Sequence, residues 1–293
     1  MSTPPASDDP LSTAVRMPLG RRGRLRDRWR MGTVIAFVPA SGGVGSSTLA
    51  AAVSVRAAAA ARSVVAVDLD PWSGCLDVVF GLEQHAGWRW PELAEVAGVV
   101  DGLGLADELP VSCGVPVLSG ASGSGWGTGP EALPVEKWLE TVPDVVAGLA
   151  DAHAVTVLDL PRDPSVLTAV SLLVDAVVVV MGSQTPQLAS ASAVVSGIRS
   201  LLGRARDGDR AWDAEPLLPI EPWVVMRGGR AEPDLEDLVV NQLDVPLVAT
   251  VGEDRRLVGE VSEGLPPGAR GRGDVVRAAD ELLLRLTDQA IAA

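Results

Sequence analysis

Lysine is almost absent from this sequence, although basic residues are not scarce. Of the 24 lysine and arginine residues in the 293-residue chain, only Lys137 is a lysine. The 38 acidic residues outnumber the basic ones and give a formal net charge of -14. A surface with this excess of negative charge is poorly suited to holding a phosphate backbone, so the composition argues against a general nucleic-acid binder.

Aromatic and cysteine side chains are also scarce. The chain has no tyrosine and only two phenylalanines, so its core volume has to come mainly from small aliphatic side chains. Its two cysteines, Cys75 and Cys113, are far apart and fit neither a zinc-ligand spacing nor a disulfide framework. This pattern favours a reducing compartment, and we expect a cytoplasmic protein.

Long uninterrupted apolar runs are missing too. Arg56 and Asp175 interrupt the two most apolar stretches before either reaches the roughly 18 residues that a membrane-spanning helix needs. Residues 1–10 are polar and acidic, without the apolar region of a secretory signal. We therefore expect no transmembrane segment, and any contact with a membrane would be peripheral.

The first 31 residues differ in charge from the rest of the chain. They contain seven arginines and three aspartates, which gives them a charge of +4 and leaves -18 on the remainder. We expect residues 1–31 to form a disordered, arginine-rich arm and residues 32–293 to form one α/β domain. The arm is either a solvated tail or an interaction arm for anionic lipid, DNA or an acidic partner, and translation could also start at Met17 or Met31.

After residue 31, short β-branched runs alternate with longer segments rich in alanine and leucine. This alternation is typical of βα units, and continuous apolar runs suit strands of a sheet that is covered on both faces. We therefore predict a doubly wound α/β fold with a mainly parallel sheet. The predicted strands are Thr33–Val38, Ser63–Leu69, Val115–Leu118, Ala154–Leu158, Ala176–Met181, Trp223–Met226 and Leu247–Val251. The predicted helices are Ser47–Ala61, Val135–Ala150, Pro164–Leu173, Pro186–Leu202, Pro233–Leu243 and Asp274–Ile291.

A glycine-rich loop connects the first predicted strand to the first predicted helix. It reads Ser41-Gly42-Gly43-Val44-Gly45-Ser46-Ser47-Thr48. Glycines allow successive backbone N–H groups to point at an anion, and the start of the following helix adds partial positive charge. The sequence therefore predicts a phosphate-binding loop at this position.

This loop resembles the deviant Walker A motif of the MinD/ParA ATPases, which reads Lys-Gly-Gly-x-Gly-Lys-Thr/Ser-Thr. Ser41 stands at the signature lysine and Ser46 at the phosphate-binding Walker lysine, while the other motif positions match. The resemblance implies a P-loop NTPase-like fold of the MinD/ParA type. It also implies that the loop binds ATP, with Ser47 as a direct ligand of Mg²⁺.

Two further motifs of this class follow in the expected order. Residues 65–71, Val-Ala-Val-Asp-Leu-Asp-Pro, resemble the second-strand motif, whose first aspartate is Asp68 here. Residues 155–161, Val-Thr-Val-Leu-Asp-Leu-Pro, resemble the Walker B strand, whose aspartate is Asp159 here. The resemblance implies that Asp68 positions the hydrolytic water or the metal shell, as the candidate catalytic residue. By the same resemblance Ser47, Asp68 and Asp159 form the metal side of the site.

Within this class, residues 68–83 and 159–161 are most similar to the CpaE/TadZ branch, the localisation proteins of Tad pilus and related secretion systems. An actinobacterial subset of that branch is labelled septum-site-determining. The resemblance implies a localisation or scaffold protein, recruited to a pole, a septum or the inner membrane surface. Its partners would be a pilus or secretion ATPase or the division machinery. The protein itself would form a homodimer with the glycine loops at the interface.

Three departures from the family pattern bear on nucleotide binding and anchoring. Arg227 occupies the strand-end position at which many relatives carry an adenine-reading asparagine, so it is a candidate cofactor-binding residue. The two missing lysines remove charge from the phosphate site, and one such charged donor commonly contributes about 2.7–4 kcal/mol to the transition state. We therefore expect weak Mg·ATP binding with weak or absent hydrolysis, and Arg162 is a candidate to supply the missing charge. The last predicted helix has acidic residues among its leucines, so we expect it to pack on the domain and not to anchor it in lipid as in MinD.

Two other functions fit parts of the sequence. Gly43-Val44-Gly45 after a strand, with an acidic residue about 20 positions later, resembles the fingerprint of NAD(P)-dependent oxidoreductases, although no tyrosine is available for catalysis. An active MinD/ParA-type ATPase in cell division or DNA partitioning would keep the same fold. The missing loop lysines and the acidic charge argue against that second alternative, although the arginine-rich arm could contact DNA.

Overall fold

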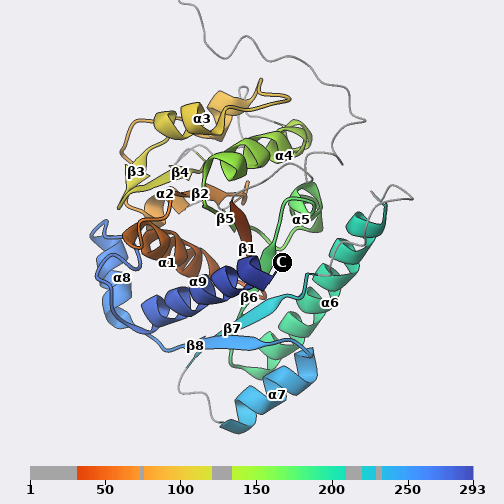
Figure 1. The fold of residues 1–293 in the computed structure, drawn as a ribbon. Coiled ribbons are helices and arrows are strands. Elements are labelled where there is room, and N and C mark those ends of the chain that lie inside the picture. Colours follow the sequence, from red (N-terminus) through yellow and green to blue (C-terminus); the bar gives the residue numbers. More distant parts are fainter. Residues whose placement is uncertain (1–31, 73–75, 121–133, 209–219, 229–232, 293) are drawn as a thin grey trace, which may run out of the picture.

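The computed structural model of the chain describes residues 32–72, 76–120, 134–208, 220–228 and 233–292 (Figure 1). The predicted arm, residues 1–31, lies outside this part of the chain, as does Cys75.

An eight-stranded sheet runs through the described residues, with its strands in the order β3-β4-β2-β5-β1-β6-β7-β8. The short strand β3 pairs antiparallel with β4, and the other neighbouring pairs of described strands are parallel. The predicted mainly parallel sheet is therefore confirmed. The strands are Thr33–Pro39 (β1), Val64–Asp68 (β2), Val111–Ser112 (β3), Val115–Leu118 (β4), Val155–Asp159 (β5), Ala176–Gly182 (β6), Trp223–Arg227 (β7) and Leu247–Val251 (β8).

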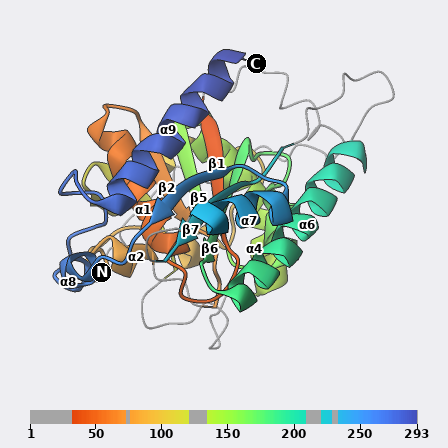
Figure 2. The same cartoon turned by 90° about the horizontal axis from the view of Figure 1, so that it is seen from below.

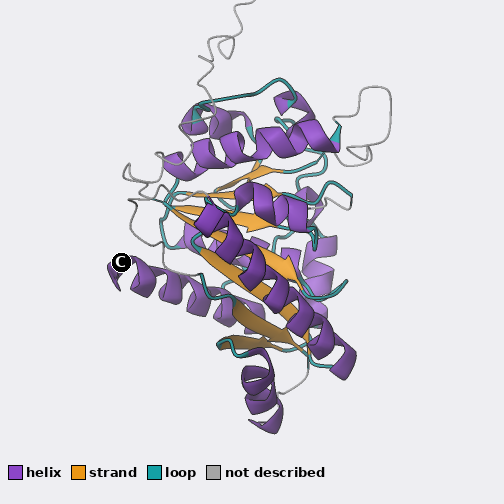
Figure 3. Cartoon of the chain, turned by 90° about the vertical axis from the view of Figure 1, so that its right-hand side faces the viewer, coloured by secondary structure: helices purple, strands orange, loops and turns teal. Residues whose placement is uncertain are grey.

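Helices cover both faces of this sheet, which makes the fold doubly wound as predicted. Figure 2 shows α1 and α9 on one side of the strands and α6 on the other, and Figure 3 shows the strands enclosed between helices. The helices are Ser46–Ala59 (α1), Leu76–Val79 (α2), Gly102–Glu108 (α3), Val135–Ala152 (α4), Pro164–Val170 (α5), Thr185–Gly208 (α6), Pro233–Leu243 (α7), Arg255–Ser262 (α8) and Asp274–Ala292 (α9), with a 3₁₀ turn at Trp90–Leu93.

The two faces of the sheet are held by two separate apolar clusters. Side chains of a strand alternate between its faces, and in β1 Val34 and Ala36 pack in the cluster that contains α4, α5 and α6. Ile35 and Phe37 pack in the other cluster, with α1 and α9. These four side chains are fully buried, so the central strand is apolar throughout because both of its faces are covered.

The C-terminal helix α9 packs on the domain, as expected from its acidic residues. Leu282 and Leu286 are buried beside α1 and the sheet, and Asp280 accepts a hydrogen bond from Arg56 of α1 at 2.8 Å. In the part of the chain that the structure describes, no helix combines the length and the apolar character needed to cross a membrane.

The structure also contains short elements that the sequence pattern did not predict. They are α2, α3, β3, α8 and the 3₁₀ turn, each between two and eight residues long. Such segments are shorter than the window of about 11 residues over which an apolar period is read, and α8 buries none of its side chains. The predicted elements are all present, with ends that differ by a few residues.

Candidate functional site

Parallel strands bring the glycine loop and the two predicted aspartates to one edge of the sheet. Strands β2, β5 and β1 are consecutive neighbours, and the segments that follow them leave from the same carboxyl edge, where α/β folds bind their ligands. Asp68 ends β2 and Asp159 ends β5, and the two residues are register partners on adjacent strands. The glycine loop begins just beyond Pro39, the last residue of β1.

A cavity of about 940 Å³ lies at this edge. Its walls are formed by the whole predicted loop from Ser41 to Thr48, by Asp68 and Asp159, and by residues 160–164 and Arg227. The structure thus brings together every residue that the sequence analysis assigned to cofactor or metal binding. The volume lies in the range of small-molecule sites.

The glycine loop presents its backbone to this cavity. Gly43 and Gly45 have φ angles of +70° and +88°, in the left-handed region that favours glycine. A Cβ atom on Gly42 or Gly43 would have no atom within 4 Å, so the loop backbone is open to a ligand there. No side chain caps the start of α1, and its first N–H groups are available to an anion.

The serines at the two lysine positions contribute buried hydroxyl groups. Ser41 Oγ has no hydrogen-bond partner among the described residues, and the Ser46 hydroxyl lies near the Asp159 carboxyl group, whose pKa it helps to lower. A buried hydroxyl without a partner costs about 1–3 kcal/mol, which a ligand carrying hydrogen-bond acceptors would recover. The two hydroxyls therefore fit an oxygen-rich ligand such as a phosphate chain.

The Asp68 carboxylate is held by donors from three neighbouring segments. One oxygen accepts a hydrogen bond from the Asp70 backbone N–H at 3.0 Å. The other accepts from the Leu76 backbone N–H at 3.0 Å and from the Ser119 hydroxyl at 2.9 Å. Asp68 is only 1% exposed, so in this structure it organises the segment between β2 and α2.

Burial gives the Asp68–Asp159 pair an unusual affinity for protons. Burial, reinforced by repulsion from Asp68, raises the pKa of Asp159 to about 8, although a hydrogen bond from Ser47 opposes the rise. Burial also raises the pKa of Asp68 to about 6, against the hydrogen bonds from Asp70, Leu76 and Ser119. Without a cation, the pair therefore retains a proton near neutral pH.

The oxygen donors at this point suit Mg²⁺ only in part. Ser47 hydrogen-bonds Asp159, so two of the three predicted metal ligands are in contact. In the described ranges, no group of three or more histidine, cysteine or acidic side chains is placed to hold a metal. Mg²⁺ accepts hydroxyl, carboxylate, water and phosphate oxygens in one octahedral set, so the residues fit a cation that arrives with phosphate.

Arg227 lies against the glycine loop itself. It is the last residue of β7, and its Nη1 donates a hydrogen bond to the carbonyl oxygen of Gly43 at 2.6 Å. A Cβ atom on Gly45 would lie 3.7 Å from Arg227 Cδ. The family resemblance placed Arg227 in the site, at the strand end where many relatives carry asparagine, but did not predict its contact with the loop backbone.

A smaller cavity of about 270 Å³ lies beside the first. Arg227 and Gly45 line both cavities. The other walls are mostly apolar and come from α1, β7, β8 and α8, among them Leu49, Val225 and Leu257.

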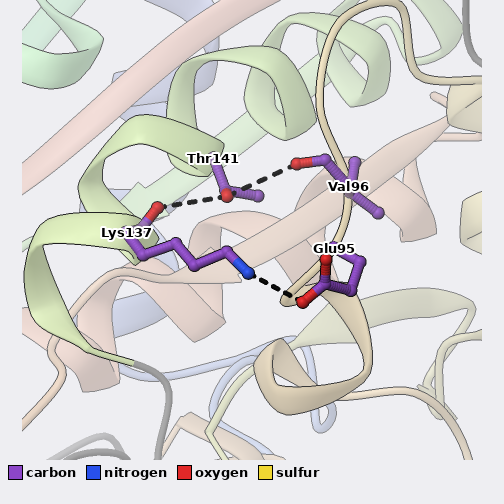
Figure 4. Close-up of polar contacts among 4 residues, drawn as sticks. All are labelled: Glu95, Val96, Lys137 and Thr141. Carbon is purple, nitrogen blue, oxygen red and sulfur yellow. Dashed lines mark hydrogen bonds and ion pairs between the residues drawn. The ribbon is translucent and has the colours of Figure 1, made fainter.

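The single lysine does not contribute charge to either cavity. Lys137 Nζ donates a hydrogen bond to Glu95 Oε1 at 2.7 Å (Figure 4). The Thr141 hydroxyl lies between the Lys137 carbonyl and Val96 in the same view. Lys137 lines neither cavity, and among the described residues Arg162 and Arg227 are the basic side chains that line the larger one.

Sequence reasoning missed two residues that support the site. Ser119 directly follows β4 and holds Asp68, and its position after a predicted strand next to β2 is the signal that could have found it. Trp90 donates a hydrogen bond from Nε1 to the Asp68 carbonyl at 2.7 Å and packs edge-on against Trp138. No local pattern around Trp90 indicates that contact.

Comparison with known proteins gives one partial sequence relationship. No protein-family profile matches the chain. The uncharacterized proteins Rv3660c and MT3760 of Mycobacterium tuberculosis are each 40% identical to it over 95 residues, which is 32% of this chain and 26% of each relative. The match thus spans about a quarter of the length of these relatives.

Solved structures resemble the chain over most of its length. A ParA family ATPase from Chlorobium tepidum aligns with a TM-score of 0.67 at 14% identity, over 87% of this chain and 99% of that one. The septum site-determining protein MinD of Pyrococcus horikoshii, solved with Mg-ADP, gives 0.60 at 20% identity over 86% and 96%. The MinC:MinD cell division complex of Aquifex aeolicus gives 0.60 at 18% identity over 86% and 96%. The chain therefore has the P-loop fold of the MinD and ParA ATPases.

Proposed function

We propose that this chain is a nucleotide-dependent localisation or scaffold protein of the MinD/ParA class, most similar to the CpaE/TadZ branch, with weak or absent ATP hydrolysis. One observation carries the proposal. The loop keeps the open backbone of a phosphate cradle, while the buried hydroxyls of Ser41 and Ser46 occupy the two lysine positions.

The cavity supports ATP with Mg²⁺ as the ligand. The loop backbone and the two serine hydroxyls offer donors to phosphate oxygens. Ser47 and Asp159 would hold the cation, and Asp68 lies next to Asp159. Bound Mg²⁺ would neutralise phosphate charge and favour the ionised form of both aspartates. The smaller apolar cavity beside Arg227 offers room for the base.

The residues of the site are poorly suited to catalysing ATP hydrolysis. A serine offers a hydrogen bond but no charge, and the loss of one charged donor lowers the rate by roughly a hundred- to a thousandfold. Both oxygens of Asp68, the candidate catalytic residue, already accept hydrogen bonds from the protein. We therefore propose that nucleotide binding, and not turnover, controls the state of this protein.

The proposal extends to assembly and location. A homodimer would place the two cavities face to face, and the exposed Trp72 on the cavity wall supports a contact there. We propose recruitment from the cytoplasm to a pole, septum or inner membrane surface by a pilus or secretion ATPase or by the division machinery. The arginine-rich residues 1–31 would add a contact with membrane or DNA.

The test is calorimetric titration of the full chain with Mg·ATP, alongside size-exclusion chromatography and a phosphate-release assay. We expect measurable but weak binding and phosphate release near the buffer rate. NADH serves as the second ligand, because tight NADH binding without ATP binding would favour the oxidoreductase reading. The absence of any nucleotide binding would refute the proposal.

An active MinD/ParA-type ATPase is the second candidate. The retained aspartates at the ends of β2 and β5 favour it, since a chain that had lost nucleotide chemistry entirely would have no need of two buried, adjacent carboxyl groups. Phosphate release well above the buffer rate in the same assay would establish this alternative.

A further inference from the structure

The glycine loop carries no cation of its own, yet a cation from a distant strand lies against it. Arg227 is 184 positions from Gly43 in the chain and reaches its carbonyl oxygen at 2.6 Å. Strand β6 separates β7 from β1, and the residue of β6 in register with Arg227 is Gly182. The contact thus joins the end of β7 to the loop that follows β1, across the carboxyl end of β6.

The Arg227 guanidinium keeps most of its hydrogen-bonding capacity. An arginine has five N–H donors in a planar fork and stays protonated at any physiological pH. In the described part of the chain, the structure records one hydrogen bond from this side chain, to Gly43, and no ion pair. Arg227 lines the larger cavity, so its remaining donors are available to an anion at the loop.

The surrounding charges explain why a cation matters at this point. Asp68, Asp70, Asp159 and Asp163 line the same cavity and would repel a phosphate chain. Arg227 is the arginine that the loop itself positions, through the Gly43 carbonyl. Arg162 also lines the cavity but is exposed, without a recorded contact to the loop.

We propose that Arg227 replaces the missing lysines as the phosphate-binding cation of this loop, within the same chain. Its Nη1 fixes the loop through Gly43, and its other N–H groups donate to the phosphate oxygens of the bound nucleotide. The residue thus binds phosphate and not the base. This inference rests on the proposed nucleotide binding and specifies which residue supplies the charge.

The test compares two ligands, Mg·ATP and Mg·tripolyphosphate, which has no base. Each is titrated calorimetrically into the full chain and into the variants Arg227→Ala, Arg227→Lys and Arg162→Ala. We expect Arg227→Ala to weaken the binding of both ligands by about ten- to a hundredfold, which is the effect of losing a hydrogen bond to a charged group. Arg227→Lys should restore part of the affinity. Arg162→Ala removes the other arginine of the cavity and should weaken binding less than Arg227→Ala does, and the reverse order would overturn the inference.

Thermal unfolding of each variant shows whether it is folded. If Arg227→Ala does not fold, Arg227→Lys still allows a comparison of ligand binding with the parent. A loss of ATP binding with unchanged tripolyphosphate binding would overturn the inference, because Arg227 would then contact the base. Equal binding by the parent and Arg227→Ala would overturn it while leaving the proposed function intact. A parent chain that binds neither ligand would refute the proposed function and, with it, the role of Arg227.

Discussion

At the scale of single residues, the site combines buried acids with an unusual source of positive charge. Asp68 and Asp159 are adjacent at the ends of β2 and β5, and the pKa of each is raised mainly by burial. Their environment suits a cation that is not part of the protein. Ser41 and Ser46 add hydrogen-bonding capacity without charge, so the electrostatics of the site depend on its ligand.

The raised pKa values predict a pH-dependent stability of the ligand-free chain. The two carboxyl groups hold protons more tightly in the folded state than in the unfolded state. The stability that they contribute to the folded state is therefore fully present below about pH 4 and is lost as pH rises through about 6 to 8. Each unit of pKa shift corresponds to about 1.4 kcal/mol. The melting temperature should therefore fall by at least about 5 °C between pH 5.5 and 8.5.

Asp159→Asn provides the check, because it removes the group with the larger shift. Differential scanning fluorimetry should show a flatter pH profile for this variant. The exposed Asp107→Asn is the matched control and should follow the parent. A parent whose melting temperature rises across this range would contradict the explanation.

Ser46→Lys tests how far the lack of a positive charge in the loop limits the affinity for Mg·ATP. The substitution returns a cation to the position of the Walker lysine, so we expect Mg·ATP to bind about tenfold more tightly or better. If Arg227 supplies the charge at present, Ser46→Lys should also restore binding to the Arg227→Ala variant. The calorimetric titration measures both effects, with Ser196→Lys as the matched control, because Ser196 is exposed and lines neither cavity. A Ser46→Lys chain that binds no better than the parent would mean that charge does not limit affinity.

At the scale of elements, tight backbone contacts join segments that follow different helices. Gly81, just after α2, has a φ angle of +68°, and a Cβ atom there would lie 2.4 Å from the carbonyl oxygen of Gly264. Gly264 lies beyond the end of α8. The surface helix α8, which buries no side chain, is thereby linked to the segment after β2.

Gly81→Ala should therefore destabilise the fold. The left-handed backbone costs about 1–2 kcal/mol for a residue with a Cβ atom, and the overlap with Gly264 adds to it, so we expect a loss of roughly 2–4 kcal/mol. Gly259→Ala in α8 is the matched control, since no atom lies within 4 Å of its added Cβ. That change should be neutral or stabilising by up to about 1 kcal/mol. Urea unfolding measures both, and equal effects would exclude the contact as the cause.

Elements with a strong local pattern were predictable from the sequence, and those held by tertiary contacts were not. The apolar strand Ala176–Gly182 and the loop before α1 are visible in the residues themselves. The 3₁₀ turn at Trp90 is fixed by a hydrogen bond to Asp68, 22 positions away. Likewise, the family resemblance indicated Arg227 as a site residue, but its contact with Gly43 depends on the order of β1, β6 and β7.

At the scale of the whole molecule, net charge opposes assembly while one exposed side chain favours it. A charge of -14 makes two copies repel each other. Trp72 lines the larger cavity and is 76% exposed, and a large aromatic residue in that position is the type that anchors interfaces. Bound Mg·ATP carries net negative charge, so it can favour the dimer only through contacts that it makes across the two facing cavities, and dimerisation and ligand binding should be coupled through those contacts.

Analytical ultracentrifugation with and without Mg·ATP tests this coupling. We expect the dimer fraction to rise with ligand and with ionic strength, since salt screens the repulsion between copies over about 10 Å at 0.1 M. Trp72→Ser should lower the association constant of the dimer at least tenfold without lowering the melting temperature. Val99→Ser is the matched control, because Val99 is 74% exposed but lines neither cavity. Equal losses in both variants would place the interface elsewhere, and a dimer insensitive to Mg·ATP would separate assembly from the nucleotide site.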